Sequence, residues 1–219
     1  MKNIGLIDDK DPQRLAFMRK LDLKLEEEYP GWKVIDSKPF KEINDYNPWI
    51  LENEISILII DERLNEGKLE DGTHVGYYGS SLVKELRNYF KDFPIYCITN
   101  FDISDELKES TKYFNLVLSR DSFDKDIKNY LNSFIKTGIS FYTEFQKELG
   151  RLGELSEKIA KGEATRDDIA EIRALQTRLV IPHLTQDLQS REKYLTDLEE
   201  KIEEIKGMQQ TLIKYLDKK

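Results

Sequence analysis

The chain has 219 residues, of which 42 are acidic and 34 basic, and its formal net charge at pH 7 is −8. This length suits one domain plus an appendage, and the negative charge argues against a general nucleic-acid binder, because such proteins gather Lys and Arg on one face to displace counterions from phosphates. The single cysteine, Cys97, excludes a disulfide framework, and no apolar run is long enough to span a bilayer, so we expect a cytoplasmic protein without membrane insertion.

The first half of the chain alternates short apolar runs with amphipathic segments. We expect strands at 4–7, 32–35, 55–64, 94–99 and 116–118. We expect helices between them at 12–28, 39–51, 81–90 and 105–113. The first helix follows Asp11 and Pro12, a pair typical of an N-cap acid with proline at the first helical position. This alternation predicts a doubly wound parallel sheet of about five strands with helices on both faces.

The third expected strand begins at Ile55 with an apolar run rich in isoleucine that ends in Asp61. Such a run is typical of a strand buried on both faces in the middle of a parallel sheet. Asp61 then stands at the carboxyl end of the strand, the edge where ligands bind in open α/β sheets. Taken alone, Asp61 is equally well explained as the cap of a turn. Asp8, Asp9 and Thr99 also follow or end expected strands, so all four should share one rim, which favours a site.

A polar segment, 65–80, follows this strand and holds four glycines and His74. It is longer than most strand-to-helix connections, and loops of that length tend to be functional lids or flexible insertions. His74 has no second histidine or cysteine nearby to complete a metal site, so we expect it to be exposed to solvent.

The second half of the chain has a different pattern. Apolar residues mostly three or four apart predict one long helix over 122–160, which Gly162 ends, and Thr165 opens a second helical segment. Pro182 kinks or ends that segment, and an apolar heptad seam of about four repeats covers 188–216. The pattern therefore predicts a coiled coil or an antiparallel helical bundle.

Three polar residues in this second half have two interpretations each. Arg191 and Gln209 interrupt the seam, where polar residues either fix register and oligomeric state or simply reach solvent near an end. His183 lies where a phosphorylatable histidine of a bundle could stand, but no acidic or amide partner follows it in the pattern of phosphotransfer helices. We interpret His183 as an ordinary helix-start residue.

The acids at the expected rim define the chemistry. Asp8, Asp9 and Asp61, held close together, repel one another unless a cation neutralises them, and Mg²⁺ is the hard ion that fits a site with few protein ligands. Mg²⁺ also bridges to phosphoryl oxygens, which lets a carboxylate attack phosphorus. Thr99 could donate its hydroxyl to a phosphoryl oxygen, and Arg120 could balance another. The rim therefore has the parts needed to form an aspartyl phosphate.

Residues 1–130 resemble the receiver domain of bacterial two-component response regulators. The segments that match are Leu6–Asp9, Leu58–Asp61, Ile98–Asn100 and Leu118–Arg120. The resemblance implies a flavodoxin-like, receiver-type sheet and a protein that is not an enzyme beyond self-phosphorylation and autodephosphorylation. It implies Asp61 as phosphoacceptor, Thr99 as switch hydroxyl, and Mg²⁺ held by Asp8, Asp9 and Asp61 with the backbone carbonyl of Arg63.

The chain departs from the family pattern at several positions. The family has a lysine after the fifth strand, whereas here Arg120 is the nearest cation after a one-residue shift, with Ser119 as the alternative occupant. Arg63 and Leu64 stand where Met-Pro often follows the acceptor, and the fifth strand carries no switch aromatic. These departures support an alternative, a pseudo-receiver that acts as an interaction module without phosphorylation.

We expect two domains, a receiver-like domain over 1–125 and a helical or coiled-coil output or dimerisation region over 126–219. A histidine kinase or a small phosphodonor would phosphorylate Asp61, and the tail would respond by forming a homodimer or docking a protein partner. Residues 121–219 contain 17 basic and 19 acidic residues and no helix-turn-helix followed by a basic helix, so no DNA-binding domain is expected. A flavodoxin-like enzyme with a phosphate-bearing cofactor is disfavoured, because two acids replace a phosphate loop after the first strand.

Overall fold

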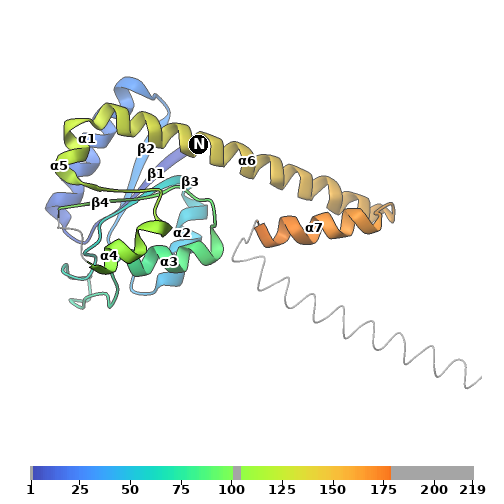
Figure 1. The fold of residues 1–219 in the computed structure, drawn as a ribbon, viewed down its shortest axis with the longest axis horizontal. Helices are drawn as coiled ribbons and strands as arrows, with labels where there is room; N and C mark the ends of the chain where they lie inside the picture. Colours follow the sequence, from blue (N-terminus) through green and yellow to red (C-terminus); the bar gives the residue numbers. More distant parts are fainter. Residues whose placement is uncertain (1, 101–104, 179–219) are drawn as a thin grey trace, which may run out of the picture. The chain divides into compact units, whose positions relative to one another are not determined.

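The computed structural model describes residues 2–100 and 105–178, which form a five-stranded parallel sheet with helices on both faces (Figure 1). The strands are β1 (Lys2–Ile7), β2 (Trp32–Ser37), β3 (Ile55–Ile60), β4 (Ile95–Thr99) and β5 (Leu116–Ser119). Their order in the sheet is β2-β1-β3-β4-β5, the doubly wound order of flavodoxin-like folds. The predicted fold class is confirmed.

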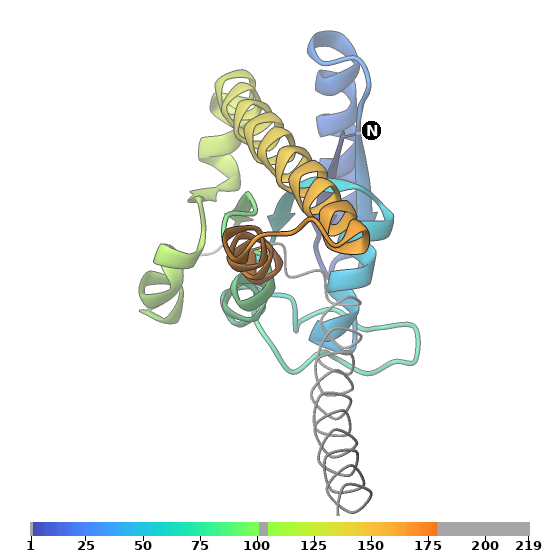
Figure 2. The same ribbon diagram turned by 90° about the vertical axis from the view of Figure 1, so that its right-hand side faces the viewer.

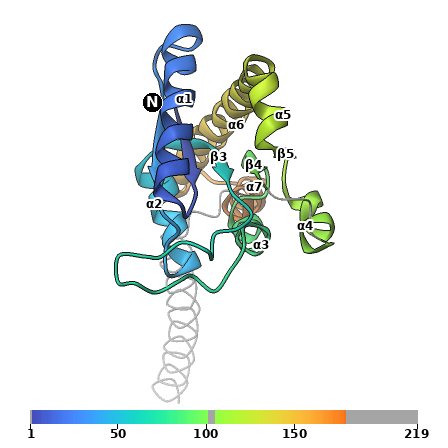
Figure 3. The same ribbon diagram turned by 90° about the vertical axis from the view of Figure 1, so that its left-hand side faces the viewer.

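Two layers of helices cover the sheet, as Figure 3 shows from one end. The helices are α1 (Asp11–Glu28), α2 (Tyr46–Glu52), α3 (Gly79–Tyr89), α4 (Asp105–Ser110), α5 (Arg120–Lys125), α6 (Ile127–Lys161) and α7 (Arg166–Arg178). Short 3-10 turns precede α2 (Ile43–Asp45) and follow α4 (Thr111–Tyr113). Helices α1, α5 and the start of α6 pack on one face, and α2, α3 and α4 pack on the other.

Strand β3 is buried along its whole length, as its isoleucine-rich run predicts. Ile57 and Ile59 belong to the core under α1 and α6, whereas Leu58 and Ile60 belong to the core under α2 and α3. This alternation follows from the two-residue period of a strand. Burying each of these side chains contributes about 1.5–3 kcal/mol, so β3 stabilises the cores on both faces of the sheet.

Helix α1 begins one residue earlier than predicted. Asp11 is its first residue rather than its N-cap, and Lys10 takes the cap position without a side-chain hydrogen bond. The carboxylate of Asp11 is drawn into ion pairs instead, 2.6 Å from Arg14 Nη2 and 2.8 Å from Lys38 Nζ. Opposite charges compete with the backbone for this carboxylate, which is why the cap prediction was wrong.

The single helix predicted over 122–160 is wrong, because the chain breaks between α5 and α6. Asp126 has φ −139° and ψ 40°, outside the helical region. The break redirects the chain so that α6 crosses the sheet. A Cβ on Gly138 would lie 2.6 Å from Cγ1 of Ile57, so a glycine is what allows this close approach.

Helices α6 and α7 form an antiparallel hairpin (Figure 1, Figure 2). Gly162 ends α6 in the left-handed conformation, φ +74°, and Thr165 begins α7, so both predicted boundaries are confirmed. Thr165 and Asp168 make a reciprocal capping box, with Thr165 N–H donating to Asp168 Oδ2 at 2.9 Å and Asp168 N–H to Thr165 Oγ1 at 3.1 Å. The hairpin contains a small apolar cluster of Leu155, Ile172 and Leu175 with partly buried neighbours.

Several predictions fall on residues outside those described. These are Pro182, His183, Arg191, Gln209 and the heptad seam over 188–216, so the coiled coil stays a prediction, as does the division into domains at 125 and 126. Within the described ranges, none of the helices combines the length and apolar character that a membrane crossing requires.

Candidate functional site

Three acids meet at the carboxyl ends of β1 and β3. Asp8 and Asp9 follow β1 and Asp61 follows β3, and the two strands are neighbours with Ile7 beside Ile60. One carboxylate oxygen from each acid lies within 4.8 Å of the others. The three residues are buried, with Asp61 only 6% exposed. The structure therefore brings together the acids that the sequence placed on one rim.

Each acid is held by hydrogen bonds to the surrounding backbone or side chains. Asp8 Oδ1 accepts from the backbone N–H of Lys10 at 2.9 Å, and Asp61 Oδ1 accepts from the backbone N–H of Glu62 at 2.8 Å. Asp9 Oδ2 accepts from the backbone N–H of Gly67. Asp9 Oδ1 is buried and has no hydrogen-bond partner within residues 2–100 and 105–178. A buried carboxylate oxygen without a donor is a site for a proton or a cation.

Burial makes the ionised forms of two acids costly. Desolvation raises the pKa of Asp61 to about 6, and the negative charge of Asp8 adds to the rise, while the hydrogen bond from Thr99 and the charge of Arg120 oppose it. Desolvation also raises the pKa of Asp9, against the lowering effect of its hydrogen bond from the Gly67 backbone. The site therefore holds more negative charge than its protein neighbours can neutralise.

The residues present fit a divalent cation. Mg²⁺ prefers oxygen ligands from one or two carboxylates and keeps several waters, and the acids supply three carboxylates with an unpartnered oxygen on Asp9. Asp8, Asp9 and Asp61 are the residues that would hold it. The side chain of Arg63 pairs with Glu66 at 2.8 Å, and the predicted role of its backbone carbonyl stays a prediction.

Thr99 and Arg120 complete the rim. Thr99 ends β4, is 1% exposed, and its side chain hydrogen-bonds Asp61. Arg120 is the first residue of α5, and its Nη2 donates to Asp8 Oδ2 in a salt bridge that is largely buried. The guanidinium carbon also lies 5.0 Å from the centroid of the Phe17 ring, within the range of a cation–π contact.

The structure separates the two residues that the sequence offered in place of the family's lysine. Ser119 is the N-cap of α5, where its Oγ accepts from the backbone N–H of Ser122 at 3.1 Å. Arg120, not Ser119, contacts an acid of the site. Of these two residues, Arg120 is therefore the one that can supply a positive charge at the rim.

The long connection between β3 and α3 folds back over the acids; its length indicated a functional lid or a flexible insertion, but the sequence did not identify the residues that make the contacts. Besides the hydrogen bond from Gly67 to Asp9, Glu66 pairs with Lys10 at 2.5 Å. A Cβ on Gly67 would overlap the backbone carbonyl oxygen of Asp9, so only glycine allows this approach. The length of the loop and its glycine content were the signals that the sequence carried. His74 in the same loop is exposed, as predicted.

Glu62 is a second residue that sequence reasoning missed. It is 4% exposed, accepts from the backbone N–H of Ser80 at 2.8 Å, and accepts from the Ser80 hydroxyl at 2.7 Å. The backbone N–H of Gly79 donates to the Glu62 carbonyl at 2.8 Å. These bonds fix the start of α3 directly beside Asp61.

Comparison with family models and with curated proteins gives no match. Among solved structures, a LuxR-family two-component response regulator from Aurantimonas sp. SI85-9A1 is 17% identical with a TM-score of 0.44, over 60% of this chain and 82% of its own. The response regulator TrrA from Thermotoga maritima, solved in complex with Mg²⁺-BeF, is 18% identical with a TM-score of 0.43, over 61% of this chain and 99% of its own. A LuxR-family DNA-binding response regulator from Staphylococcus aureus is 13% identical with a TM-score of 0.43, over 63% and 99%. The strand order, with acids at the carboxyl ends of β1 and β3, identifies the first part of the chain as a receiver-type fold.

Proposed function

We propose that the protein is a signalling switch of the response-regulator kind, phosphorylated on Asp61 with Mg²⁺. The observation that supports this most strongly is the meeting of Asp8, Asp9 and Asp61 within 4.8 Å of one another, with Thr99 hydrogen-bonded to Asp61. A structural turn needs only one of these side chains. A phosphoacceptor needs all four, because it combines a nucleophile, ligands for a cation and a hydroxyl donor.

Asp61 is the nucleophile in this proposal. A pKa of about 6 leaves its carboxylate ionised at neutral pH but less stabilised than a solvated one. A carboxylate oxygen attacks the phosphorus of a phosphohistidine on a histidine kinase, or of a small phosphodonor. The bond from Asp61 to phosphorus forms as the bond to the leaving group breaks, and the leaving group departs with its electron pair. Bound Mg²⁺ would neutralise the charges that the carboxylate and the phosphoryl oxygens bring together.

Thr99 and Arg120 would respond to the new group. The hydroxyl of Thr99 can donate to a phosphoryl oxygen in place of Asp61. Arg120 retains donors for a second phosphoryl oxygen, since its Nε is buried without a hydrogen-bond partner among the described residues. A guanidinium is planar and binds phosphate in a bidentate manner, which a lysine cannot do, so this replacement keeps the charge and changes the geometry.

The readout in this proposal passes to the helical region. Arg120 is the first residue of α5, and α6 follows after Asp126, so a movement of Arg120 acts at the base of the long helix. The region over 126–219 would then form a homodimer or dock a protein partner. We place the switch in the cytoplasm, where a histidine kinase would deliver the phosphoryl group.

Intact-mass spectrometry of the full chain tests this function. Incubation with acetyl phosphate and Mg²⁺ should add the mass of one phosphoryl group, and neither the Asp61→Asn variant nor a sample with chelator should gain it. Light scattering on the same samples reports the oligomeric state. Wild-type protein that gains no mass, or a gain that persists in Asp61→Asn, would overturn the assignment.

One observation favours the alternative of a pseudo-receiver. Arg120 already neutralises the charge of Asp8, so less negative charge is left at the rim for Mg²⁺ to balance. If the pair is permanent, Mg²⁺ should leave the melting temperature unchanged even at millimolar concentration. A saturable rise in melting temperature with Mg²⁺ that is lost in Asp9→Asn favours the switch instead.

A further inference from the structure

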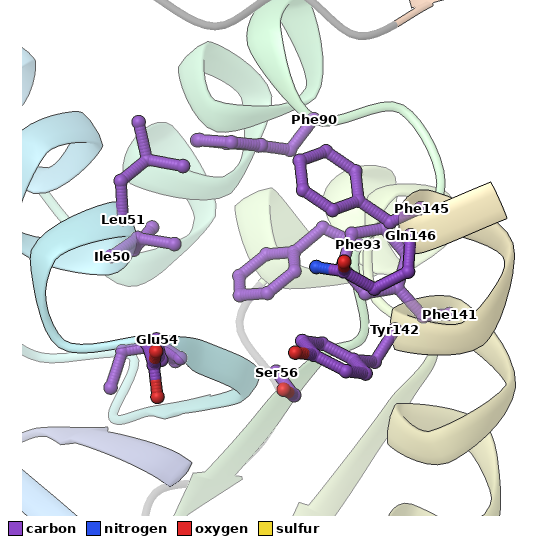
Figure 4. Close-up of a pocket in the computed structure, with 11 residues that line it drawn as sticks. Ile50, Leu51, Glu54, Ser56, Phe90, Phe93, Phe141, Tyr142, Phe145 and Gln146 are labelled. Carbon is purple, nitrogen blue, oxygen red and sulfur yellow. The ribbon is translucent and has the colours of Figure 1, made fainter. Parts of the chain in front are cut away.

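A cavity of about 170 Å³ lies at the amino-terminal end of β3, the opposite edge of the sheet from the acids (Figure 4). Three parts of the chain line it: the end of α2 with the first residues of β3, the connection between α3 and β4, and α6. The cavity therefore lies where the long helix leaves the sheet. No residue of the acidic rim or of α7 lines it.

Five of the eleven residues that line the cavity are aromatic. The rings are those of Phe90, Phe93, Phe141, Tyr142 and Phe145. Phe93 and Phe141 meet edge to face with centroids 5.4 Å apart, and Phe141 stacks on Phe145 at 5.9 Å. These contacts hold the rings around the space. An apolar cavity of about 150 Å³ binds benzene, so this one has room for a six-membered ring.

The wall also contains polar side chains, among them Ser56 and Gln146. Ser56 is 1% exposed and is one of the residues that line the cavity. Figure 4 shows Ser56 at the cavity, with the amide of Gln146 directed toward the same space. A neutral hydrogen bond contributes about 0.5–1.5 kcal/mol, so a ligand with a hydroxyl gains from bonding to Ser56.

We propose that this cavity binds a small aromatic molecule with one six-membered ring and a neutral hydrogen-bonding group, of the phenol class. The ring would lie among the phenylalanines, and the hydroxyl would bond to Ser56. Charge disfavours an aromatic carboxylate, because Glu54 lines the cavity and the whole chain carries −8. The proposal is independent of phosphorylation, since no residue of the acidic rim lines this cavity.

A ligand here touches both the sheet and α6. Ser56 and Phe93 belong to the sheet side, and Phe141 and Phe145 belong to the helix. Occupancy should therefore hold α6 more firmly against β3 and slow the exchange of amide hydrogens around 141–146. This gives the site a readout that simple surface adsorption would not produce.

The test uses phenol as the probe and the full chain, with melting temperature and hydrogen exchange as readouts. Phenol should raise the melting temperature saturably and slow exchange around 141–146, and benzoate should do neither. Gln146→Trp places a ring in the cavity from an exposed helix position and should weaken phenol binding at least tenfold. Lys147→Trp is the matched control, because Lys147 is exposed on the same helix and outside the lining, and it should bind phenol as the wild type does.

Ser56→Ala tests the hydroxyl separately. Removing this hydroxyl should leave the fold intact and should reduce the preference for phenol over toluene about fivefold. Asp61→Asn should leave phenol binding unchanged, which separates this proposal from the proposed phosphorylation. No saturable effect of phenol on the wild type, equal effects of the two tryptophan variants, or equal binding of benzoate would overturn the proposal.

Discussion

Replacing Asp61 by asparagine should stabilise the protein in the absence of divalent cations. The side chain is buried, and its pKa rises from 3.8 to about 6, so its ionised form opposes folding at neutral pH. Two pKa units at about 1.4 kcal/mol each give a cost of up to about 3 kcal/mol. Asparagine is neutral at every pH and can keep the hydrogen bonds to Glu62 and Thr99, so it avoids that cost.

The pH dependence fixes the sign of this effect. Because the folded-state pKa is the raised one, the stability that the neutral carboxyl contributes is fully present below pH 3.8 and is lost as the pH rises through about 6. The advantage of Asp61→Asn should therefore be largest near pH 7.5 and should shrink by about 1.4 kcal/mol at about pH 5. Urea unfolding with chelator present, at both pH values, measures the free energy of unfolding directly.

Asp71→Asn is the control for charge removal as such. The exposed carboxylate of Asp71 accepts hydrogen bonds from Thr73 and Lys41, and these lower its pKa to about 2, so its removal should bring no gain in stability. An Asp61→Asn variant that is less stable than the wild type near pH 7.5, or an advantage that does not change with pH, would refute the reasoning. The first result would mean that the hydrogen bonds to Asp61 outweigh its desolvation, and the second that the gain does not come from the titration of Asp61.

Three further predictions concern backbone positions, and urea unfolding checks each of them. Gly138→Ala should destabilise the protein by about 1–3 kcal/mol, because the added Cβ overlaps the sheet. Gly150→Ala is the control on the same helix, and because its Cβ lies in open space it should stabilise the protein by up to about 1 kcal/mol. Equal effects of the two substitutions would contradict the close approach of α6 to the sheet. Gly67→Ala should displace the loop over 65–78, lower the free energy of unfolding by about 1–3 kcal/mol and make the loop more sensitive to protease. Gly76→Ala should do none of this, because a Cβ there meets no other atom. A Gly67→Ala variant whose loop resists protease would disprove the contact of Gly67 with Asp9. Thr165→Ala should cost about 1 kcal/mol through loss of the capping box, and an unchanged unfolding midpoint would show that α7 does not need it.

The site acids were predictable because their position depends on topology alone. Once strands and helices alternate, right-handed crossovers put the carboxyl end of every parallel strand on one rim. Asp8, Asp9, Asp61 and Thr99 follow from that rule without any knowledge of side-chain contacts. The ion pair of Arg120 with Asp8 does not follow from it, because the sequence left Ser119 open as the alternative to Arg120 at that position. Only the capping of α5 by Ser119 separates them.

The errors have a different physical origin. The helical spacing of apolar residues continues across Asp126, through Phe123, Ile127 and Leu131. The periodicity of the sequence therefore does not reveal the break that separates α5 from α6. The bond from Gly67 to Asp9 joins residues 58 positions apart, and nothing in either local sequence encodes that approach. Local pattern therefore predicts elements and rims, whereas the turns between elements and the closing of the loop depend on tertiary contacts.

The charge balance at the rim links the cation to the switch. One guanidinium faces three buried carboxylates, and it already pairs with Asp8. A phosphoryl group on Asp61 would add a charge of about −1.5 to −2, and if Arg120 turned toward it, Asp8 would lose its partner. Both changes increase the unbalanced negative charge in a buried space, which costs several kcal/mol unless a cation enters. The same ion pair that makes a pseudo-receiver conceivable therefore makes any phosphorylated state dependent on a divalent cation.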